Sequence, residues 1–250
     1  DDDIGLGETG LDVAIIGTPV TEHHALDVLE GHALLALQGP KAAEVLARHA
    51  PGCSRLVFMS FAEMDVAGIS CGVARAGYTG EDGYELIVPS EAATAIWKEL
   101  MDRGATPCGL GARDVLRLEA GLLLHGNDMD TSVNPYEAGL ERFVDPDRDA
   151  YLAGPALRRI RDQCVTRTLV GFNMVERGIA RHGYAITDGE NVIGAVTSGG
   201  PSPTLDRNIG LGYVPSGHAS HGSRIYVEVR GRPIAAEVTT LPFYARSRSA

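Results

Sequence analysis

The chain has 250 residues and a formal net charge of -11 at pH 7, with 33 acidic and 22 basic side chains. An acidic surface of this kind argues against a nucleic-acid partner. No apolar run reaches the roughly 18 residues of a membrane-spanning helix, so a soluble protein with no membrane partner is expected. The cysteines form no CxxC pair, which indicates no metal site and no disulfide framework and favours a reducing compartment such as the cytoplasm. They are Cys53, Cys71, Cys108 and Cys164.

The first half of the chain predicts alternating strands and helices, which we assign to an α+β domain over residues 1–124. Apolar residues with period 2 indicate strands, and apolar residues at i, i+3 and i+4 spacing indicate helices. The order is typical of a split βαβ (ferredoxin-like) two-layer fold. The expected strands are 34–37, 64–67, 71–75 and 84–88. One helix is expected to begin at Gly39-Pro40, and a second, with Ser90 as its N-cap, is expected to run to Met101.

The second half predicts a different architecture. Residues 125–165 are polar with few periodic signals, and we expect a linker with local structure there. Residues 166–250 contain short apolar runs separated by turn signals, which indicates a small C-terminal antiparallel β-barrel. The expected strands are 168–172, 184–186, 192–196, 209–213, 224–229 and 235–239.

Two charged side chains occupy positions that packing alone does not favour. Glu85 follows a glycine-rich turn, and strand alternation places it on the same face as Ile87, where a carboxylate needs a polar partner. Arg113 falls in the first turn of an apolar-periodic helix, where a cation opposes the helix dipole. Tyr78 lies in the same glycine-rich turn that precedes Glu85.

Two interpretations of these residues stay open from the pattern alone. Glu85 could be a solvated glutamate on an edge strand, and Arg113 could pair with Asp114 or Glu119. Alternatively, the residues could recognise a small polar heterocycle that has adjacent N–H donors and a distant anionic group. A carboxylate accepts two such N–H bonds side by side, and an arginine suits the anion.

Two shorter motifs point to other chemistry, and we set both aside. The run Gly68 to Gly72 (GISCG) matches the G-x-S-x-G elbow of hydrolases, but strand-like residues follow it where the elbow requires a helix. The run that begins at Asp128 starts like an EF-hand loop. It has Val133 and Gly139 where that loop requires glycine and glutamate, so calcium binding is not expected.

Longer stretches of the chain resemble the aminomethyltransferase (T-protein) of the glycine cleavage system. The resemblance covers residues 31–243, with order and spacing preserved. It rests on Leu34 to Pro40 (LLALQGP), Gly77 to Gly83 (GYTGEDG), Gly109 to Gly121, Gly126 to Asp130 (GNDMD), Val196 to Leu205 (VTSGGPSPTL) and Gly212 to Pro215 (GYVP).

The resemblance implies a substrate, a partner and three binding residues. Tetrahydrofolate would be the co-substrate, and its N5 would take a methylene group from the aminomethyl-lipoyl arm of the H-protein, with release of ammonia. The family's pterin-binding glutamate falls on Glu85, its loop tyrosine on Tyr78 and its folate-binding arginine on Arg113. These are the same three residues that the physical argument above singles out.

The chain departs from the family pattern at both ends. Nothing matches the family's N-terminal segment, about a third of its length, which holds a catalytic aspartate in a Gly-Gly-x-x-Asp-Asp run. Asp1-Asp2-Asp3 has the wrong neighbours to be that run, so we assign no catalytic residue and activity of this chain alone is in doubt. Near the C-terminus an ungapped match puts Arg248 where some relatives use a tyrosine on the folate tail, and Tyr244 is the nearest tyrosine.

Two related interpretations are also open. One is the folate domain of a dimethylglycine- or sarcosine-oxidising enzyme, although no upstream GxGxxG flavin motif is present. The other is a non-catalytic folate-binding protein of the same superfamily. That group carries a Lys-Gly-Cys-Tyr-x-Gly-Gln-Glu run where this chain has Ala76 to Glu81 (AGYTGE).

Overall fold

The structure is a computed structural model that describes residues 14–18, 31–148 and 151–246. Asp1-Asp2-Asp3 and Arg248 lie outside the described residues. The chain divides into two compact units, one of residues 1–117 with 246–250 and one of residues 118–245. Within the described part of the chain, no helix is long and apolar enough to cross a membrane.

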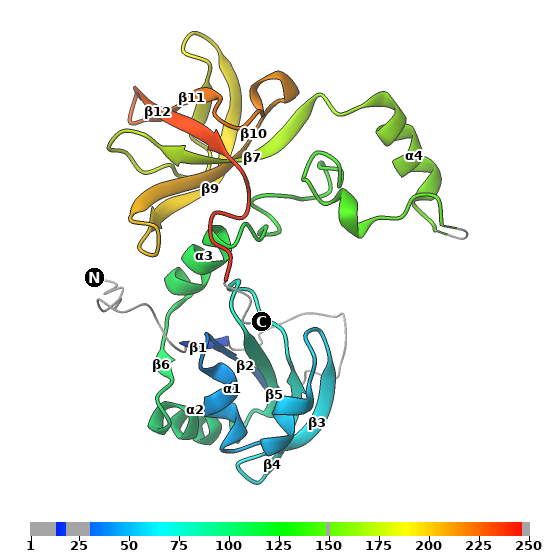
Figure 1. The fold of residues 1–250 in the computed structure, drawn as a ribbon, viewed down its shortest axis with the longest axis vertical. Coiled ribbons are helices and arrows are strands. Elements are labelled where there is room, and N and C mark those ends of the chain that lie inside the picture. Colours follow the sequence, from blue (N-terminus) through cyan, green and yellow to red (C-terminus); the bar gives the residue numbers. More distant parts are fainter. Residues whose placement is uncertain (1–13, 19–30, 149–150, 247–250) are drawn as a thin grey trace. The chain divides into compact units, whose positions relative to one another are not determined.

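The first unit is built on a six-stranded sheet with the order β3-β4-β5-β2-β1-β6 (Figure 1). Neighbouring strands are antiparallel except β1 and β6, which pair in parallel. The strands are β1 (Ala14–Thr18), β2 (His32–Gln38), β3 (Phe61–Val66), β4 (Ile69–Ala74), β5 (Gly83–Pro89) and β6 (Thr106–Pro107). The helices are α1 (Ala42–Ala47), the 3-10 turn η2 (Pro51–Arg55), α2 (Ala93–Asp102) and α3 (Leu110–Glu119), of which α3 continues into the second unit.

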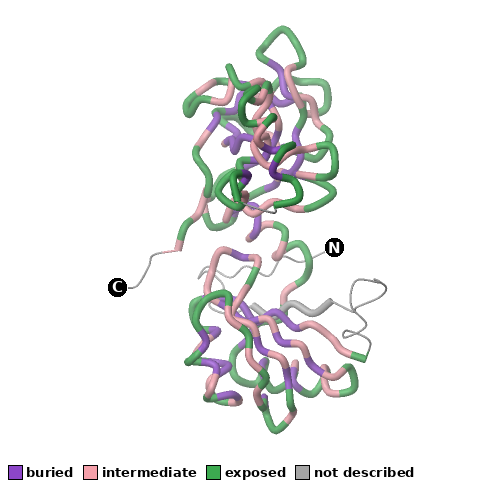
Figure 2. Tube along the Cα trace, turned by 90° about the vertical axis from the view of Figure 1, so that its right-hand side faces the viewer, coloured by how far each residue is buried: buried purple, intermediate pink, exposed green. Residues whose placement is uncertain are grey.

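Helices α1 and α2 cover one face of this sheet. Leu46 of α1 and Leu100 of α2 are fully buried in the same core as Leu37 and Leu86 from the strands. Each such side chain contributes about 1.5–3 kcal/mol through removal from water. Because side chains alternate along a strand, Glu85 projects from the opposite face. Figure 2 shows buried residues recurring along the strands and exposed residues following the loops.

The predicted α+β class with a C-terminal barrel is confirmed, but the strand order differs from a split βαβ fold. Between α1 and α2 the chain forms three strands, and β3, β4 and β5 pair as consecutive antiparallel neighbours. Two strands therefore separate β2 from β3, where a split βαβ fold has one. The prediction that Ser90 caps α2 is wrong, because the N-cap residue is Ala92 and no side chain caps it.

The second unit contains a closed six-stranded barrel with the order β10-β7-β12-β11-β8-β9. The expected strands all form, with shifts of a few residues at their ends. Phe172, Ile186 and Val227 are among the fully buried residues of its core. The strands are β7 (Arg167–Met174), β8 (Ala185–Thr187), β9 (Val192–Ser202), β10 (Arg207–Pro215), β11 (Arg224–Val229) and β12 (Arg232–Thr239).

The segment before the barrel contains the 3-10 turn η3 (Glu141–Phe143) and helix α4 (Gly154–Gln163). It is tied to the barrel by Asp128, a carboxylate that is only 1% exposed. Asp128 accepts hydrogen bonds from the hydroxyls of Thr197 (2.5 Å) and Ser198 (2.7 Å) and from the backbone N–H of Leu124 (2.9 Å). These donors occupy the oxygens that an EF-hand would offer to calcium.

Candidate functional site

The structure brings Tyr78 and Arg113 together. Tyr78 lies in the loop of residues 75–82 between β4 and β5, and Arg113 lies at the end of the first turn of α3. The Arg113 guanidinium carbon is 4.9 Å from the centroid of the Tyr78 ring. A cation over an aromatic face at this distance contributes about 0.5–1 kcal/mol at an exposed site. The glycine-rich loop and the helix therefore present a ring and a positive charge side by side.

The simpler interpretation of Arg113 as half of a local salt bridge is wrong. Asp114 pairs with Arg117 at 2.6 Å, and Glu119 accepts a hydrogen bond from Ser202 at 2.6 Å. Among the residues that the structure describes, no ion pair or hydrogen bond engages the Arg113 guanidinium. Its N–H donors are consequently open to an anionic ligand.

Glu85 lies on β5, in the middle of the sheet rather than on an edge strand. Its cross-strand neighbours are Ala36 on β2 and Ala74 on β4, so only small side chains flank the carboxylate. Glu85 is half-buried. Within the described part of the chain it makes no hydrogen bond or ion pair, including with Tyr78 or Arg113. A half-buried carboxylate that no described residue engages keeps its oxygens available to N–H donors of a ligand.

Gln38 braces the loop that carries Tyr78, a role that the sequence analysis did not assign. Its side chain is 1% exposed, and its Nε2 donates to the carbonyl oxygens of Ala76 (3.1 Å) and Tyr84 (3.2 Å). Its Oε1 accepts from the Thr79 hydroxyl at 3.2 Å. A Cβ atom on Gly83 would lie 2.5 Å from the Gln38 amide carbon, and one on Gly77 would overlap its oxygen. The sequence offers one hint of this role, a glutamine at the end of an otherwise apolar strand, but its contacts with Gly77 and Gly83 appear only in the structure.

An ion pair joins the first and last residues of this loop. Arg75 donates two hydrogen bonds to the Asp82 carboxylate, at 3.0 and 2.7 Å, and a third to the Leu56 carbonyl oxygen at 2.8 Å. The hydrogen bonds from Arg75 hold the pKa of Asp82 below its usual value near 3.8. Together with Gln38, this clamp fixes both ends of the loop before any ligand arrives.

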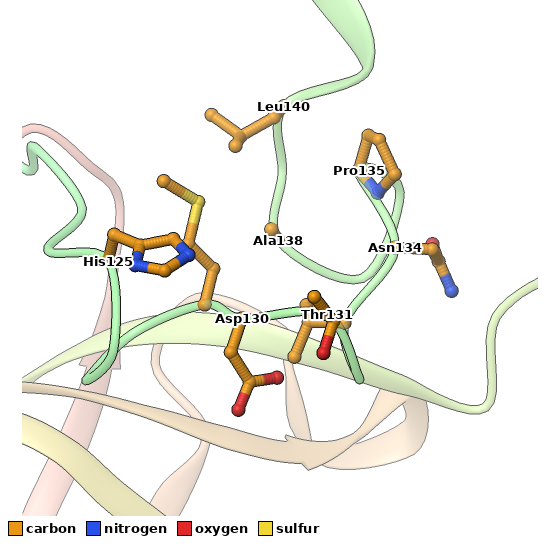
Figure 3. A pocket seen from close by; sticks show the side chains of 9 residues that line it. His125, Asp130, Thr131, Asn134, Pro135, Ala138 and Leu140 are labelled. Carbon is orange, nitrogen blue, oxygen red and sulfur yellow. The ribbon is translucent and has the colours of Figure 1, made fainter. Parts of the chain in front are cut away.

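A separate hollow of about 220 Å³ lies in the segment that precedes the barrel (Figure 3). Leu140, Pro135 and Ala138 border it together with the His125 imidazole. Asp130 also contributes to its lining, but its carboxylate accepts two hydrogen bonds from Ser132, at 2.7 and 2.6 Å. The hollow is mainly apolar and offers few polar groups to orient a ligand.

The motifs that suggested other chemistry have structural roles. Ser70 is the second residue of β4, and the strand continues to Ala74 where an elbow requires a helix, so no nucleophile elbow forms. In the part of the chain that the structure describes, no three His, Cys, Asp or Glu side chains are grouped to hold a metal ion. Thus the loop of residues 75–82, β5 and α3 carry the candidate binding groups.

Comparisons with known proteins agree with this architecture. A family model described as the GCVT N-terminal domain matches residues 7–148, and one described as the glycine cleavage T-protein C-terminal barrel domain matches residues 167–245. The chain is 44% identical to an aminomethyltransferase of Thermosynechococcus vestitus, over 90% of this chain and 62% of that protein. It is 46% identical to one of Rubrobacter xylanophilus, over 89% of this chain and 60% of that protein.

A solved structure is also similar. The crystal structure of the glycine cleavage system aminomethyltransferase T from Bartonella henselae superposes with a TM-score of 0.78 at 38% sequence identity. The match covers 85% of this chain and 60% of that one. The chain thus spans about three fifths of the length of the relatives that it matches.

Proposed function

Because the chain belongs to the glycine cleavage T-protein family, we propose that it is the folate-binding and barrel portion of an aminomethyltransferase, with tetrahydrofolate as co-substrate. The observation that carries this proposal is the Arg113 guanidinium over the Tyr78 ring, in the unit whose sheet presents the open Glu85 carboxylate. These groups fit the two ends of a folate, which has a heterocycle with adjacent N–H donors and a glutamate tail.

Each residue has a proposed task. Glu85 accepts two N–H groups of the pterin, and each charge-assisted bond contributes about 1.5–3 kcal/mol. The Tyr78 ring offers an aromatic surface for a flat part of the ligand. Arg113 holds a carboxylate of the tail through its planar N–H fork. The clamps of Gln38 and Arg75 reduce the ordering entropy that the loop loses on binding.

In the proposed reaction, the lipoylated H-protein supplies the carbon as an aminomethyl group on sulfur. The carbon–sulfur bond and the carbon–nitrogen bond break, and the carbon becomes bonded to N5 and N10 of tetrahydrofolate. The protons from N5 and N10 leave with the ammonia and on the lipoyl sulfur. The described residues contribute binding and orientation. No side chain of this chain is assigned to proton transfer.

The two related interpretations receive no support from the relatives. The curated proteins that match at 44% and 46% identity are named aminomethyltransferases, and neither is named as an oxidising enzyme or a non-catalytic folate-binding protein. The loop Ala76 to Glu81 also lacks the cysteine of the non-catalytic group.

The proposal is tested by equilibrium dialysis of 5-formyltetrahydrofolate, a stable reduced folate, against the chain and two variants. Glu85→Gln should weaken binding by about 1–3 kcal/mol, because the charge-assisted bonds to the pterin are lost. Glu63→Gln is the matched control, since Glu63 lies on the same face of the sheet but is exposed on the edge strand β3. Unchanged affinity in Glu85→Gln, or equal loss in both variants, would remove Glu85 from the site.

A further inference from the structure

Three arginines line a second hollow, which lies wholly in the barrel unit and has a volume of about 320 Å³. Arg177 and Arg181 come from the loop between β7 and β8, and Arg230 comes from the turn between β11 and β12. The rest of the wall is uncharged and comes from Gly178, Ile179, Tyr184 and Val229. In a chain with 33 acidic and 22 basic side chains, this concentration of positive charge is unexpected.

The guanidinium groups of the hollow differ from those of two other arginines in the same unit. Arg161 pairs with Asp147 at 2.8 Å and Arg167 with Glu137 at 2.9 Å. By contrast, the guanidinium groups of the three arginines in the hollow make no ion pair or hydrogen bond within the residues described. All three side chains are exposed, and so they can meet a ligand from solvent.

The loop that carries Arg177 and Arg181 is fixed to the barrel. Asn208 Nδ2 donates to the Gly178 carbonyl oxygen at 2.8 Å, and His182 Nδ1 is 2.8 Å from the Thr197 carbonyl oxygen. The loop also packs closely on β9, because a Cβ atom on Gly199 would lie 2.7 Å from the Ala180 carbonyl oxygen. Its two arginines therefore extend from a backbone that is already ordered, which lowers the entropy lost on binding.

Arg230 occupies a backbone conformation that arginine disfavours. Its φ is 53° and that of Gly231 is 75°, so both central residues of the β11–β12 turn are left-handed. Two-residue turns of this kind favour Asn-Gly or Gly-Gly, and a non-glycine residue with a long side chain is strained there. Turn geometry thus gives no reason for an arginine at this position. A requirement for positive charge in the hollow would explain why arginine is present.

We propose that this hollow is an anion site, which binds a small polyanion that carries carboxylate or phosphate groups. Three guanidinium groups from two fixed loops can each donate paired N–H groups to such anions. The tyrosine and the aliphatic residues exclude water from one side of the site. The site is independent of the proposed folate site, which lies in the other unit.

Isothermal titration calorimetry with citrate and with pyrophosphate, in a chloride buffer of low ionic strength, tests this proposal. We expect saturable binding of one anion per chain that weakens as salt is added. Arg181→Gln should weaken it by about tenfold or more, as expected for loss of a charge-assisted pair of hydrogen bonds. Tighter binding of citrate would indicate a carboxylate ligand, and tighter binding of pyrophosphate a phosphate ligand. Absence of heat with both anions overturns the site.

Two further variants separate a built site from general attraction. Arg207→Gln removes the same charge from an exposed arginine of the barrel outside the hollow, and should leave affinity within about twofold of the unmodified chain. Equal loss in Arg207→Gln and Arg181→Gln overturns the proposal. Arg230→Asn creates the favoured Asn-Gly turn, so thermal stability should rise while anion affinity falls. Retained affinity in Arg230→Asn would show that Arg230 serves no ligand.

Discussion

The guanidinium of Arg113 lies over the ring of Tyr78, 4.9 Å from its centroid. This contact joins the first turn of α3 to the loop between β4 and β5. Without it, Arg113 would be a cation placed against the helix dipole, with its neighbouring carboxylates engaged elsewhere. We therefore propose that the pair forms part of a binding surface.

A substitution of Arg113 should discriminate between the two ends of a folate. Arg113→Ala should weaken binding of 5-formyltetrahydrofolate by about 1.5–3 kcal/mol, because a charged partner of the tail carboxylate is lost. Binding of a reduced pterin that lacks the glutamate tail should change much less. Parallel titrations with the two ligands measure the difference. Equal losses would make Arg113 a structural residue only.

The Tyr78 ring matters through its face more than through its hydroxyl in this account. Tyr78→Phe keeps the aromatic face under Arg113 and should bind folate within a few tenths of a kcal/mol of the unmodified chain. Tyr78→Leu removes the face and should weaken binding by about 0.5–1.5 kcal/mol. The folate affinity of both variants shows whether the face or the hydroxyl contributes. A larger loss of affinity in Tyr78→Phe than in Tyr78→Leu would point to the hydroxyl.

The space under the glycine-rich loop is set by Gln38. Gly83→Ala should destabilise the first unit by about 1–3 kcal/mol, because the new Cβ atom crowds the Gln38 amide. Gln38→Ala should cost about 1–3 kcal/mol, because it leaves buried carbonyl groups without donors. The double variant should be more stable than the sum predicts, by about 0.5–3 kcal/mol, since the crowding is gone. Urea unfolding of the three variants tests this, and additive losses would contradict the brace.

The contribution of the Arg75–Asp82 ion pair to the stability of the fold should depend on pH. The folded state lowers the pKa of Asp82 from its usual value near 3.8, mainly through the hydrogen bonds from Arg75. The clamp therefore stabilises the fold fully above that value, and this stability is lost as the pH falls through the lower folded pKa. Asp82→Asn should cost about 1 kcal/mol at pH 7. The difference in unfolding free energy between the two chains should shrink below pH 4, and a constant difference would count against the clamp.

In the second unit, Asp128 should be a strong determinant of stability. Asp128→Ala leaves the hydroxyls of Thr197 and Ser198 and the N–H of Leu124 without their acceptor, and should cost about 2–4 kcal/mol. Asp188→Ala is the control, because its carboxylate is exposed and accepts hydrogen bonds from the backbone N–H groups of its own turn. Thermal unfolding of the two variants compares the positions. Similar losses of stability in the two variants would show that the buried hydrogen bonds of Asp128 stabilise the unit no more than an exposed turn does.

The sequence predicted the barrel strands well because each is a short apolar run closed by a strong turn signal such as Asp188-Gly189 or Arg230-Gly231. It also predicted that Glu85 and Ile87 share a sheet face, which follows from strand alternation. The family resemblance was confirmed by the family models. The charge pattern selected Glu85 and Arg113, and Tyr78 was chosen from the glycine-rich turn before Glu85, but their roles as folate ligands remain predictions.

Other features depend on pairing across the chain and could not be predicted. The meander of β3, β4 and β5 is decided by which strands pair, and short strands of similar pattern give no preference for one partner. The role of Gln38 depends on contacts with Gly77 and Gly83, which a local pattern does not reveal. The partners of Asp114 and Glu119 could not be predicted either. Asp114 pairs with Arg117, and Glu119 accepts a hydrogen bond from Ser202, which lies on a distant strand.

The central claim is that this chain binds a reduced folate, and calorimetric titration of the unmodified chain with 5-formyltetrahydrofolate tests it most directly. The account predicts saturable binding of one ligand per chain, with a dissociation constant in the micromolar range, which corresponds to about 8 kcal/mol. Circular dichroism on the same sample establishes that the chain is folded. A folded chain that takes up no folate at millimolar concentration would contradict the account.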